Sequence, residues 1–206
     1  MSAKRCGVAV LASGRGSNFK AIAEACRRED FPATVVCLVT DNPEAGALET
    51  AKANGIPTFT VDAGPKKGRI PKEVEDEIAS ICEQQGADVI ALAGFMRILR
   101  GALLDRFEGR IINIHPALLP SFKGLHGVRQ ALEYGVKVAG CTVHFVDRSI
   151  DGGPIILQSA VEVRDDDDED SLAARILEQE HRIYVEAVEL FALGKLEVIE
   201  RRVRTG

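Results

Sequence analysis

The residues best suited to chemistry lie in two short motifs of this 206-residue chain. Asn113 and His115 stand two positions apart in an apolar run that ends at Pro116, and Asp151 opens a Gly-Gly-Pro turn. An amide can donate to an oxyanion, an imidazole can carry a proton, and a carboxylate can hold that imidazole as a cation. Together they suit the transfer of an acyl group, so these three residues are the candidate catalytic group.

The spacing of Asn113 and His115 also predicts where they lie. An apolar run with polar residues at alternate positions indicates a buried strand, in which alternate side chains share a face. Pro116 cannot donate to a sheet ladder, so the strand is expected to end there, at the edge where open α/β sheets bind ligands. The structural alternative is that Asn113 caps the strand end and that His115 is a hydrogen-bonded core residue.

The first half of the chain alternates apolar runs with stretches of helical spacing. In order, these are a strand (Cys6–Ala12), a loop (Ser13–Asn18), a helix (Phe19–Arg28), a strand (Thr34–Thr40), a helix (Pro43–Ala53) and a strand (Ile56–Val61). A helix and a strand, Lys72–Gln85 and Ala87–Ala93, continue the pattern. This rhythm predicts an α/β fold, with a single doubly wound, mostly parallel sheet that carries helices on both faces in a Rossmann-like manner.

The second half is expected to add an antiparallel pair and a long helix. Val138–Val146 and Pro154–Val163 read as strands, and Asp151 sits in their connection. An acidic run precedes the helix, which Asp170 or Ser171 is expected to cap. The last twelve residues are expected to form one short edge strand.

The loop Ser13–Asn18 is a candidate anion site. It lacks the lysine of a Walker A motif and the third glycine of a dinucleotide fingerprint, so ATP and NAD are poorly supported. A monophosphate fits better, because glycines permit close approach while helix-start amides and the Ser17 hydroxyl bond anionic oxygens. The alternative is an ordinary strand-to-helix turn, which also favours Gly, Ser and Asn.

Two further segments have both a functional and a structural explanation. After Gly94, Phe95 and Met96 either line a flat heterocycle or bury the start of another helix. The polar connection 62–71 carries Arg69 and two lysines, which either stay in solvent or meet an acidic ligand tail.

Glu180 interrupts the apolar stripe of the last long helix, four residues after Ile176 and three before Ile183. A carboxylate on a buried face is costly unless it is paired. Arg175 and Arg182 lie five residues before it and two after it, and these spacings do not face Glu180. Its partner is therefore expected from elsewhere in the fold or from a ligand.

Composition limits the remaining possibilities. The net charge of −5 and scattered basic residues suggest no nucleic-acid or membrane partner, and no apolar window reaches the roughly 18 residues of a membrane span. The five cysteines form no close pair, which argues against disulfides and a zinc site, and no metal is expected. With no signal peptide, repeat or interior boundary, one cytoplasmic domain over residues 1–206 is expected.

The motifs together resemble those of a known family. The residues concerned are Ser13–Asn18, Ala93–Leu99, Asn113–Pro116, Leu118–Pro120, Asp151–Pro154 and Glu180–His181. They closely resemble the phosphoribosylglycinamide formyltransferases of de novo purine biosynthesis, over essentially the whole chain. The resemblance implies direct transfer of a formyl group from 10-formyltetrahydrofolate to the amine of N1-(5-phospho-ribosyl)glycinamide, through a tetrahedral intermediate and without metal or ATP. It implies small-molecule substrates and a monomer or homodimer.

The resemblance also implies roles for individual residues. Asn113, His115 and Asp151 match the catalytic trio, and Gly16, Ser17 and Asn18 match the loop that holds the nucleotide phosphate. Met96, Arg97, Ile98, Leu99, Arg69 and Asn113 match folate-binding positions, and Glu180 matches a position beside the substrate amine. The N-terminal half would thus hold the phosphate site, and the C-terminal half the folate and catalytic site.

Two related families share some of these motifs. Methionyl-tRNA formyltransferase and formyltetrahydrofolate hydrolase are similar at Asn113–His115 and Asp151–Pro154, and Ser121–Gly124 is similar to the hydrolase. Those relatives carry an additional domain, so the length of this chain favours the transferase, with the hydrolase second. A non-catalytic folate or nucleotide binder on the same fold is the third hypothesis.

Overall fold

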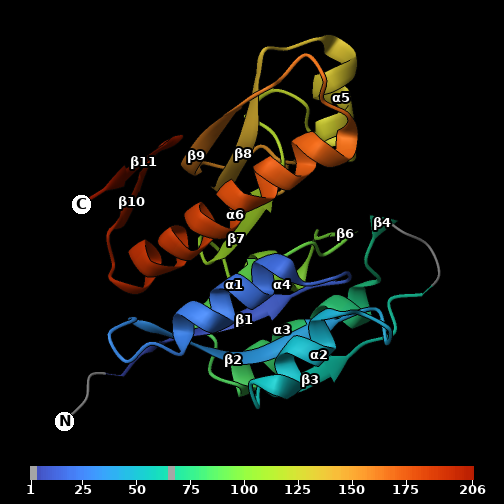
Figure 1. Cartoon of the computed structure of the whole chain (residues 1–206). Coiled ribbons are helices and arrows are strands. Elements are labelled where there is room, and N and C mark those ends of the chain that lie inside the picture. Colours follow the sequence, from blue (N-terminus) through green and yellow to red (C-terminus); the bar gives the residue numbers. More distant parts are fainter. Residues whose placement is uncertain (1–3, 65–67) are drawn as a thin grey trace. The chain divides into compact units, whose positions relative to one another are not determined.

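A computed structural model describes residues 4–64 and 68–206 and divides the chain into two compact units, Met1–Ile112 and Asn113–Gly206 (Figure 1). The division falls inside one strand, β7 (Ile111–His115). The expectation of one domain stays a prediction. Each unit is described separately below.

The first unit is built on four parallel strands in the order β5-β1-β2-β3. These are β1 (Cys6–Leu11), β2 (Ala33–Thr40), β3 (Thr58–Thr60) and β5 (Val89–Leu92). The helices between them are α1 (Ser17–Cys26), α2 (Ala47–Ala53), α3 (Lys72–Gln84) and α4 (Ala102–Arg106). Helix α1 packs on α2, and α3 packs on α4. Because parallel crossovers are right-handed and the strand order reverses at β1, these two pairs belong on opposite faces.

Hydrogen bonds join the carboxyl ends of β1, β2 and β5. Ser13 N donates to Gly94 O (3.2 Å), and Ser13 Oγ accepts from Met96 N (3.2 Å). The Asn42 side chain donates to Ser13 O (3.0 Å). The glycine-rich loop after β1 and the turn after β5 are therefore held together by Ser13. A separate two-stranded sheet pairs β4 (Gly68–Arg69) with β6 (Arg97–Ile98) in parallel.

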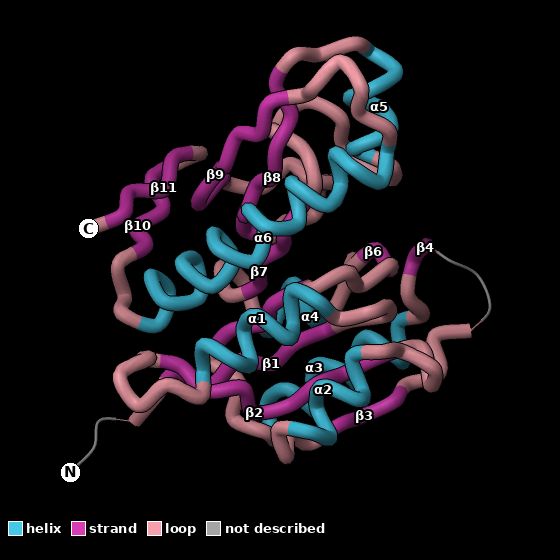
Figure 2. The backbone as a smooth tube through the Cα atoms, viewed as in Figure 1, coloured by secondary structure: helices cyan, strands magenta, loops and turns pink. Residues whose placement is uncertain are grey.

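The second unit contains β8 (Val138–Phe145) and β9 (Ile155–Glu162), which pair antiparallel. With β10 (Leu196–Ile199) and β11 (Arg202–Thr205), the strand order is β10-β11-β9-β8-β7. Helix α6 (Glu169–Ala192) packs on β8 and β9, and α5 (Gly127–Tyr134) packs on α6 (Figure 2). The expected α/β fold, with a mostly parallel sheet and flanking helices, is confirmed.

Several element ends differ from the sequence predictions; α1, for example, begins at Ser17 rather than Phe19. Helix α2 begins at Ala47 rather than Pro43, because Asn42 forms a turn in which its side chain accepts from Glu44 N (3.0 Å). Helix α6 is capped by Asp168, not by Asp170, in a capping box with Ser171. The chain end forms a hairpin of β10 (Leu196–Ile199) and β11 (Arg202–Thr205) rather than one strand.

The cores of both units are apolar and contain free thiols. The thiols of Cys26, Cys37, Cys82 and Cys141 are buried, and that of Cys6 is half-buried. No helix in the described part of the chain combines the length and apolar character needed to cross a membrane.

Candidate active site

Strand β7 presents Asn113 and His115 on one face, as alternation requires. His115 is 4% exposed, and Asn113 is half-buried. The ring nitrogen Nε2 of His115 lies 2.8 Å from the carbonyl oxygen of Phe122. Since a carbonyl only accepts, Nε2 carries a proton and donates to Phe122. His115 is thus a hydrogen-bonded histidine and also belongs to a charged cluster.

Asp151 contributes the carboxylate of that cluster. Its Oδ2 lies 3.5 Å from His115 Nδ1 and accepts from Gly124 N (2.7 Å), and its Oδ1 lies 3.7 Å from His144 Nε2. Asp151 has a φ of 45°, a left-handed conformation that Asp and Asn tolerate better than most residues. The turn before β9 therefore aims one carboxylate at two imidazoles.

His144 is the site residue that sequence reasoning missed. Its Nδ1 lies 2.8 Å from Phe145 O, so Nδ1 is the donor. Burial lowers the pKa of His144, outweighing the raising effects of Phe145 O and Asp151, so the ring is neutral near pH 7. Nε2 then accepts from Asn113 Nδ2 at 3.2 Å. A neutral histidine thereby orients the Asn113 amide.

The local register of β8 and β9 explains how His144 reaches the cluster. The pairing shifts between Val143, opposite Leu157, and His144, opposite Ile155. Such a bulge re-aims a side chain, and bulges are common beside functional sites. The available sequence signal was a histidine two positions after Thr142 in an apolar strand, the same alternation that marked Asn113 and His115.

Thr142 and Gln158 support the loop that follows β7. Thr142 Oγ1 donates to Ala117 O (2.7 Å) and accepts from Leu119 N (3.1 Å). Gln158 Nε2 donates to Leu119 O (2.9 Å) and Thr142 Oγ1 (3.0 Å). These bonds fix the path of the loop toward Phe122, the acceptor of His115.

In the first unit, the candidate anion loop ends at the start of α1. Gly16 is the N-cap, with φ 76° and no side-chain capping bond, and no acidic residue lies in the first turn. A Cβ on Gly16 would stand 2.7 Å from Ala47 Cβ. Only glycine combines this φ with the contact on α2. The structure thus leaves the start of α1, with Ser17 half-buried and Asn18 buried, without the usual acidic cap.

The proposed folate segment divides into exposed and buried side chains. Met96 and Ile98 are exposed apolar residues, whereas Leu99 is buried and belongs to the core. Arg97 directs its guanidinium at Asp41 (2.6 Å) rather than at solvent. Arg69 is exposed on β4. Lys66 and Lys67 lie outside the described residues.

Glu180 lies on the buried side of α6, as the stripe predicted. Burial raises the pKa of the Cys141 thiol to about 12, and the negative charge of Glu180 adds to that rise. Burial also raises the pKa of Tyr184, again with a smaller contribution from Glu180. Arg175 binds Asp167, and Arg182 contacts Glu186 (3.6 Å). Both arginines therefore have acidic partners other than Glu180.

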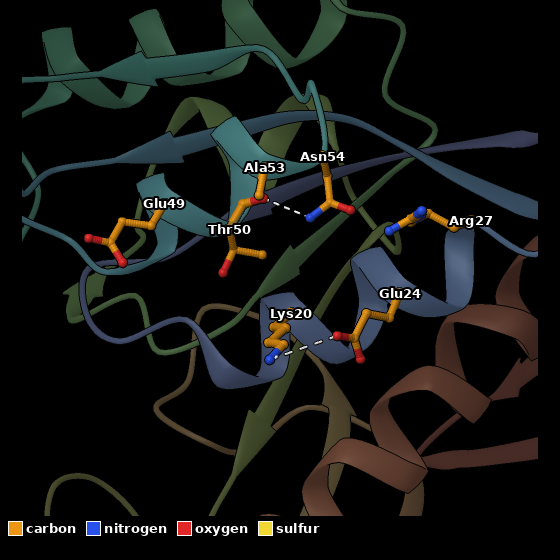
Figure 3. Close-up of a pocket in the computed structure, with 7 residues that line it drawn as sticks. All are labelled: Lys20, Glu24, Arg27, Glu49, Thr50, Ala53 and Asn54. Carbon is orange, nitrogen blue, oxygen red and sulfur yellow. Dashed lines mark hydrogen bonds and ion pairs between the residues drawn. The ribbon is translucent and has the colours of Figure 1, made fainter.

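A surface hollow of about 350 Å³ lies between α1 and α2 (Figure 3). It is lined by Lys20, Glu24, Arg27, Glu49, Thr50, Ala53 and Asn54. Lys20 contacts Glu24 (3.9 Å), and Asn54 donates to Thr50 O (2.7 Å). None of the candidate site residues lines it, so it is not assigned to the acyl chemistry.

An α/β fold that gathers an amide, two imidazoles and a carboxylate at the ends of β7 and β8 defines an acyl-transfer type of site. Sequence comparison with known proteins identifies the protein family. The family model described as formyl transferase matches residues 6–188. The chain is 42% identical to phosphoribosylglycinamide formyltransferase of Escherichia coli, over 94% of this chain and 90% of that protein.

Two further relatives point to the same family. Phosphoribosylglycinamide formyltransferase of Mycobacterium tuberculosis is 44% identical over 96% of this chain and 90% of its own length. The crystal structure of glycinamide ribonucleotide transformylase 1 from Symbiobacterium toebii superposes with a TM-score of 0.92 at 45% identity, covering 98% and 94% of the two chains. The chain belongs to the formyl transferase family, among its phosphoribosylglycinamide formyltransferases.

Proposed function

We propose that this enzyme transfers the formyl group of 10-formyltetrahydrofolate to the amine of N1-(5-phospho-ribosyl)glycinamide in de novo purine biosynthesis. Membership of the family and the names of its relatives support the reaction and both substrates. The observation that carries the proposal is the cluster in which His144 holds the Asn113 amide and Asp151 faces His115. A cytoplasmic location, and a monomer or homodimer, stay predictions.

Each member of the cluster has a role in the proposed reaction. The amine nitrogen forms a bond to the formyl carbon, and the bond from that carbon to N10 of the folate breaks. The proton lost by the amine is transferred to N10. Asn113 Nδ2 keeps one N–H beyond its bond to His144 and donates it to the oxyanion. His115 relays the proton, and Asp151 stabilises the imidazolium.

The hydrogen bond from His115 to Phe122 sets a condition on this mechanism. Nε2 is engaged by Phe122 O, and Nδ1 faces Asp151. For Nε2 to exchange a proton with the substrate, a substrate group must replace the Phe122 carbonyl. Catalytic hydrogen bonds commonly form only in the complex, so the arrangement is compatible with the role.

One turnover assay tests the proposal against the two alternatives. The loss of 10-formyltetrahydrofolate is followed with and without the glycinamide nucleotide. Loss that requires the nucleotide, with formylated nucleotide as product, supports the transferase. Loss without it would indicate a hydrolase, and no loss would indicate a binder.

The phosphate loop gives a prediction that the structure sharpens. Ser17→Ala is expected to raise KM for the nucleotide about tenfold, the effect of roughly one hydrogen bond to a charged group, while KM for the folate stays unchanged. Gly16→Val is a poorer probe, because its Cβ would meet Ala47 at 2.7 Å. That variant is expected to lose thermal stability. Steady-state kinetics with each substrate varied in turn would measure the two KM values of Ser17→Ala, and thermal melts would measure the stability of Gly16→Val. An equal rise of both KM values for Ser17→Ala would contradict the phosphate role.

Glu180 is proposed to pair with the amine end of the nucleotide. Glu180→Gln is expected to raise KM for the nucleotide while the protein stays folded, because glutamine keeps the size of the side chain but removes the charge proposed to meet the amine. Glu186→Gln is the matched control on the same helix, since Glu186 contacts Arg182 near the surface. A lower melting temperature with unchanged nucleotide KM would show instead that Glu180 serves the fold.

A further inference from the structure

A buried ion pair lies beside the proposed folate segment. Asp41 directly follows β2, and its side chain is 6% exposed. Arg97 lies on β6, its side chain is 7% exposed, and its Nε lies 2.6 Å from Asp41 Oδ2. Its Nη2 also donates to Gly64 O (2.7 Å). Asp41 Oδ1 is buried and has no hydrogen-bond partner among the described residues.

Stability alone is a weak explanation for this pair. Removing two charges from water costs about as much as their attraction returns, and apolar pairs of similar volume are often equally stable. A buried carboxylate normally gives both oxygens partners, for example by capping a turn. Asp41 instead directs one oxygen at Arg97, while Oδ1 stays unpartnered within the described residues. The carboxylate is thus used to fix the position of one guanidinium.

The backbone around Arg97 shows what that position controls. Arg97 pairs with Gly68, and Ile98 pairs with Arg69, in the two-stranded sheet of β4 and β6. Ile70 N adds a bond to Ile98 O (3.3 Å). This sheet is small, so its own ladder holds it weakly. Apart from that ladder, the Arg97 side chain ties the strand pair to the end of β2 and to Gly64.

The same strand pair carries the exposed side chains proposed to meet the folate. Arg69 is exposed on β4, Ile98 is exposed on β6, and Met96 precedes β6. A shift of Arg97 would therefore move the apolar and the basic parts of the proposed folate surface together. A displacement of about 1 Å can cost about a hundredfold, so even a smaller shift of this strand pair would weaken its fit to the folate.

We propose that Asp41 is a positioning residue for the folate substrate: it holds Arg97, and through Arg97 it sets the strand pair on which Arg69, Met96 and Ile98 stand. Asp41 itself touches no substrate. This inference rests on the proposed function, because the segment matters only if it meets a folate.

The test separates KM for the folate from KM for the nucleotide. Asp41→Asn keeps the shape but removes the charge, and it is expected to raise KM for 10-formyltetrahydrofolate about tenfold, with nucleotide KM and kcat within about twofold of wild type. The dissociation constant of tetrahydrofolate, measured by calorimetry, should rise in parallel. Asp41→Glu, which restores the charge, should recover at least half of the loss on a logarithmic scale.

Asp88→Asn is the matched control. Asp88 is another acidic residue of the first unit. It precedes β5, whereas β6 follows the other end of that strand, and its Oδ2 accepts from Gly7 N (2.7 Å). It is expected to lower the melting temperature while both KM values stay unchanged. An unchanged folate KM in Asp41→Asn, an equal rise of both KM values, or the same folate effect in Asp88→Asn would overturn the inference. Absence of formyl transfer by the wild type would instead overturn the proposed function, and this inference with it.

Discussion

Asn113→Ala is expected to lower kcat about a hundred- to a thousandfold, the usual cost of removing one oxyanion donor. The structure gives the physical reason. Neutral His144 accepts one N–H of the Asn113 amide at 3.2 Å, which leaves the second N–H in a fixed direction. A donor that is already oriented costs no reorganisation when charge develops on the formyl oxygen. Single-turnover rates at saturating substrates would measure the effect directly.

Two further variants decide how the Asn113 result is read. Asn54→Ala removes an asparagine that donates to Thr50 O at the end of α2, and its rate should equal that of the wild type. His144→Ala removes the orienting acceptor but keeps the donor, so its rate should fall less than that of Asn113→Ala. A rate near wild type for a folded Asn113→Ala would show that Asn113 is not the oxyanion donor.

Local sequence patterns predicted the parts of the site that depend on one element. Alternation in β7 placed Asn113 and His115 on one face, and the 3.6-residue stripe of α6 placed Glu180 on the buried side. Both predictions needed only the period of a strand or a helix. Turn residues also predicted a glycine-rich loop between β1 and α1, but α1 begins at Ser17, so Ser17 and Asn18 lie in the first turn of the helix and not in the loop.

The parts that sequence could not supply depend on contacts between distant segments. His144 joins the cluster through a register shift between β8 and β9, and no local pattern specifies a bulge. His115 bonds to the carbonyl of Phe122, whose φ of 54° is a left-handed conformation that is unusual for an aromatic residue. Arg97 matched a folate position by resemblance, yet its side chain pairs with Asp41, 56 residues earlier. Such pairings become visible only once the chain is folded.

Asp151→Asn is expected to lower kcat about a hundredfold or more while both KM values change little. The carboxylate lies 3.5 Å from His115 Nδ1 and is the negative charge that stabilises the imidazolium formed during proton transfer. Positioned acid–base groups contribute about a hundred- to ten-thousandfold to rates. Asparagine removes this charge but keeps the size of the side chain and, like aspartate, tolerates the φ of 45°.

The conservative geometry of Asp151→Asn makes its kinetic result interpretable. The asparagine oxygen can still accept from Gly124 N, which Asp151 now binds at 2.7 Å, so the turn before β9 should keep its conformation. Asp147→Asn is the matched control. Asp147 lies in the same connection between β8 and β9, and its Oδ1 accepts a hydrogen bond from Ser149 N (2.8 Å). If both variants lost the same factor in kcat, a general field of the acidic connection would explain the result. If Asp151→Asn kept both the wild-type kcat and the wild-type melting temperature, His115 would not need the carboxylate. The assigned mechanism would then be wrong at its proton-transfer step.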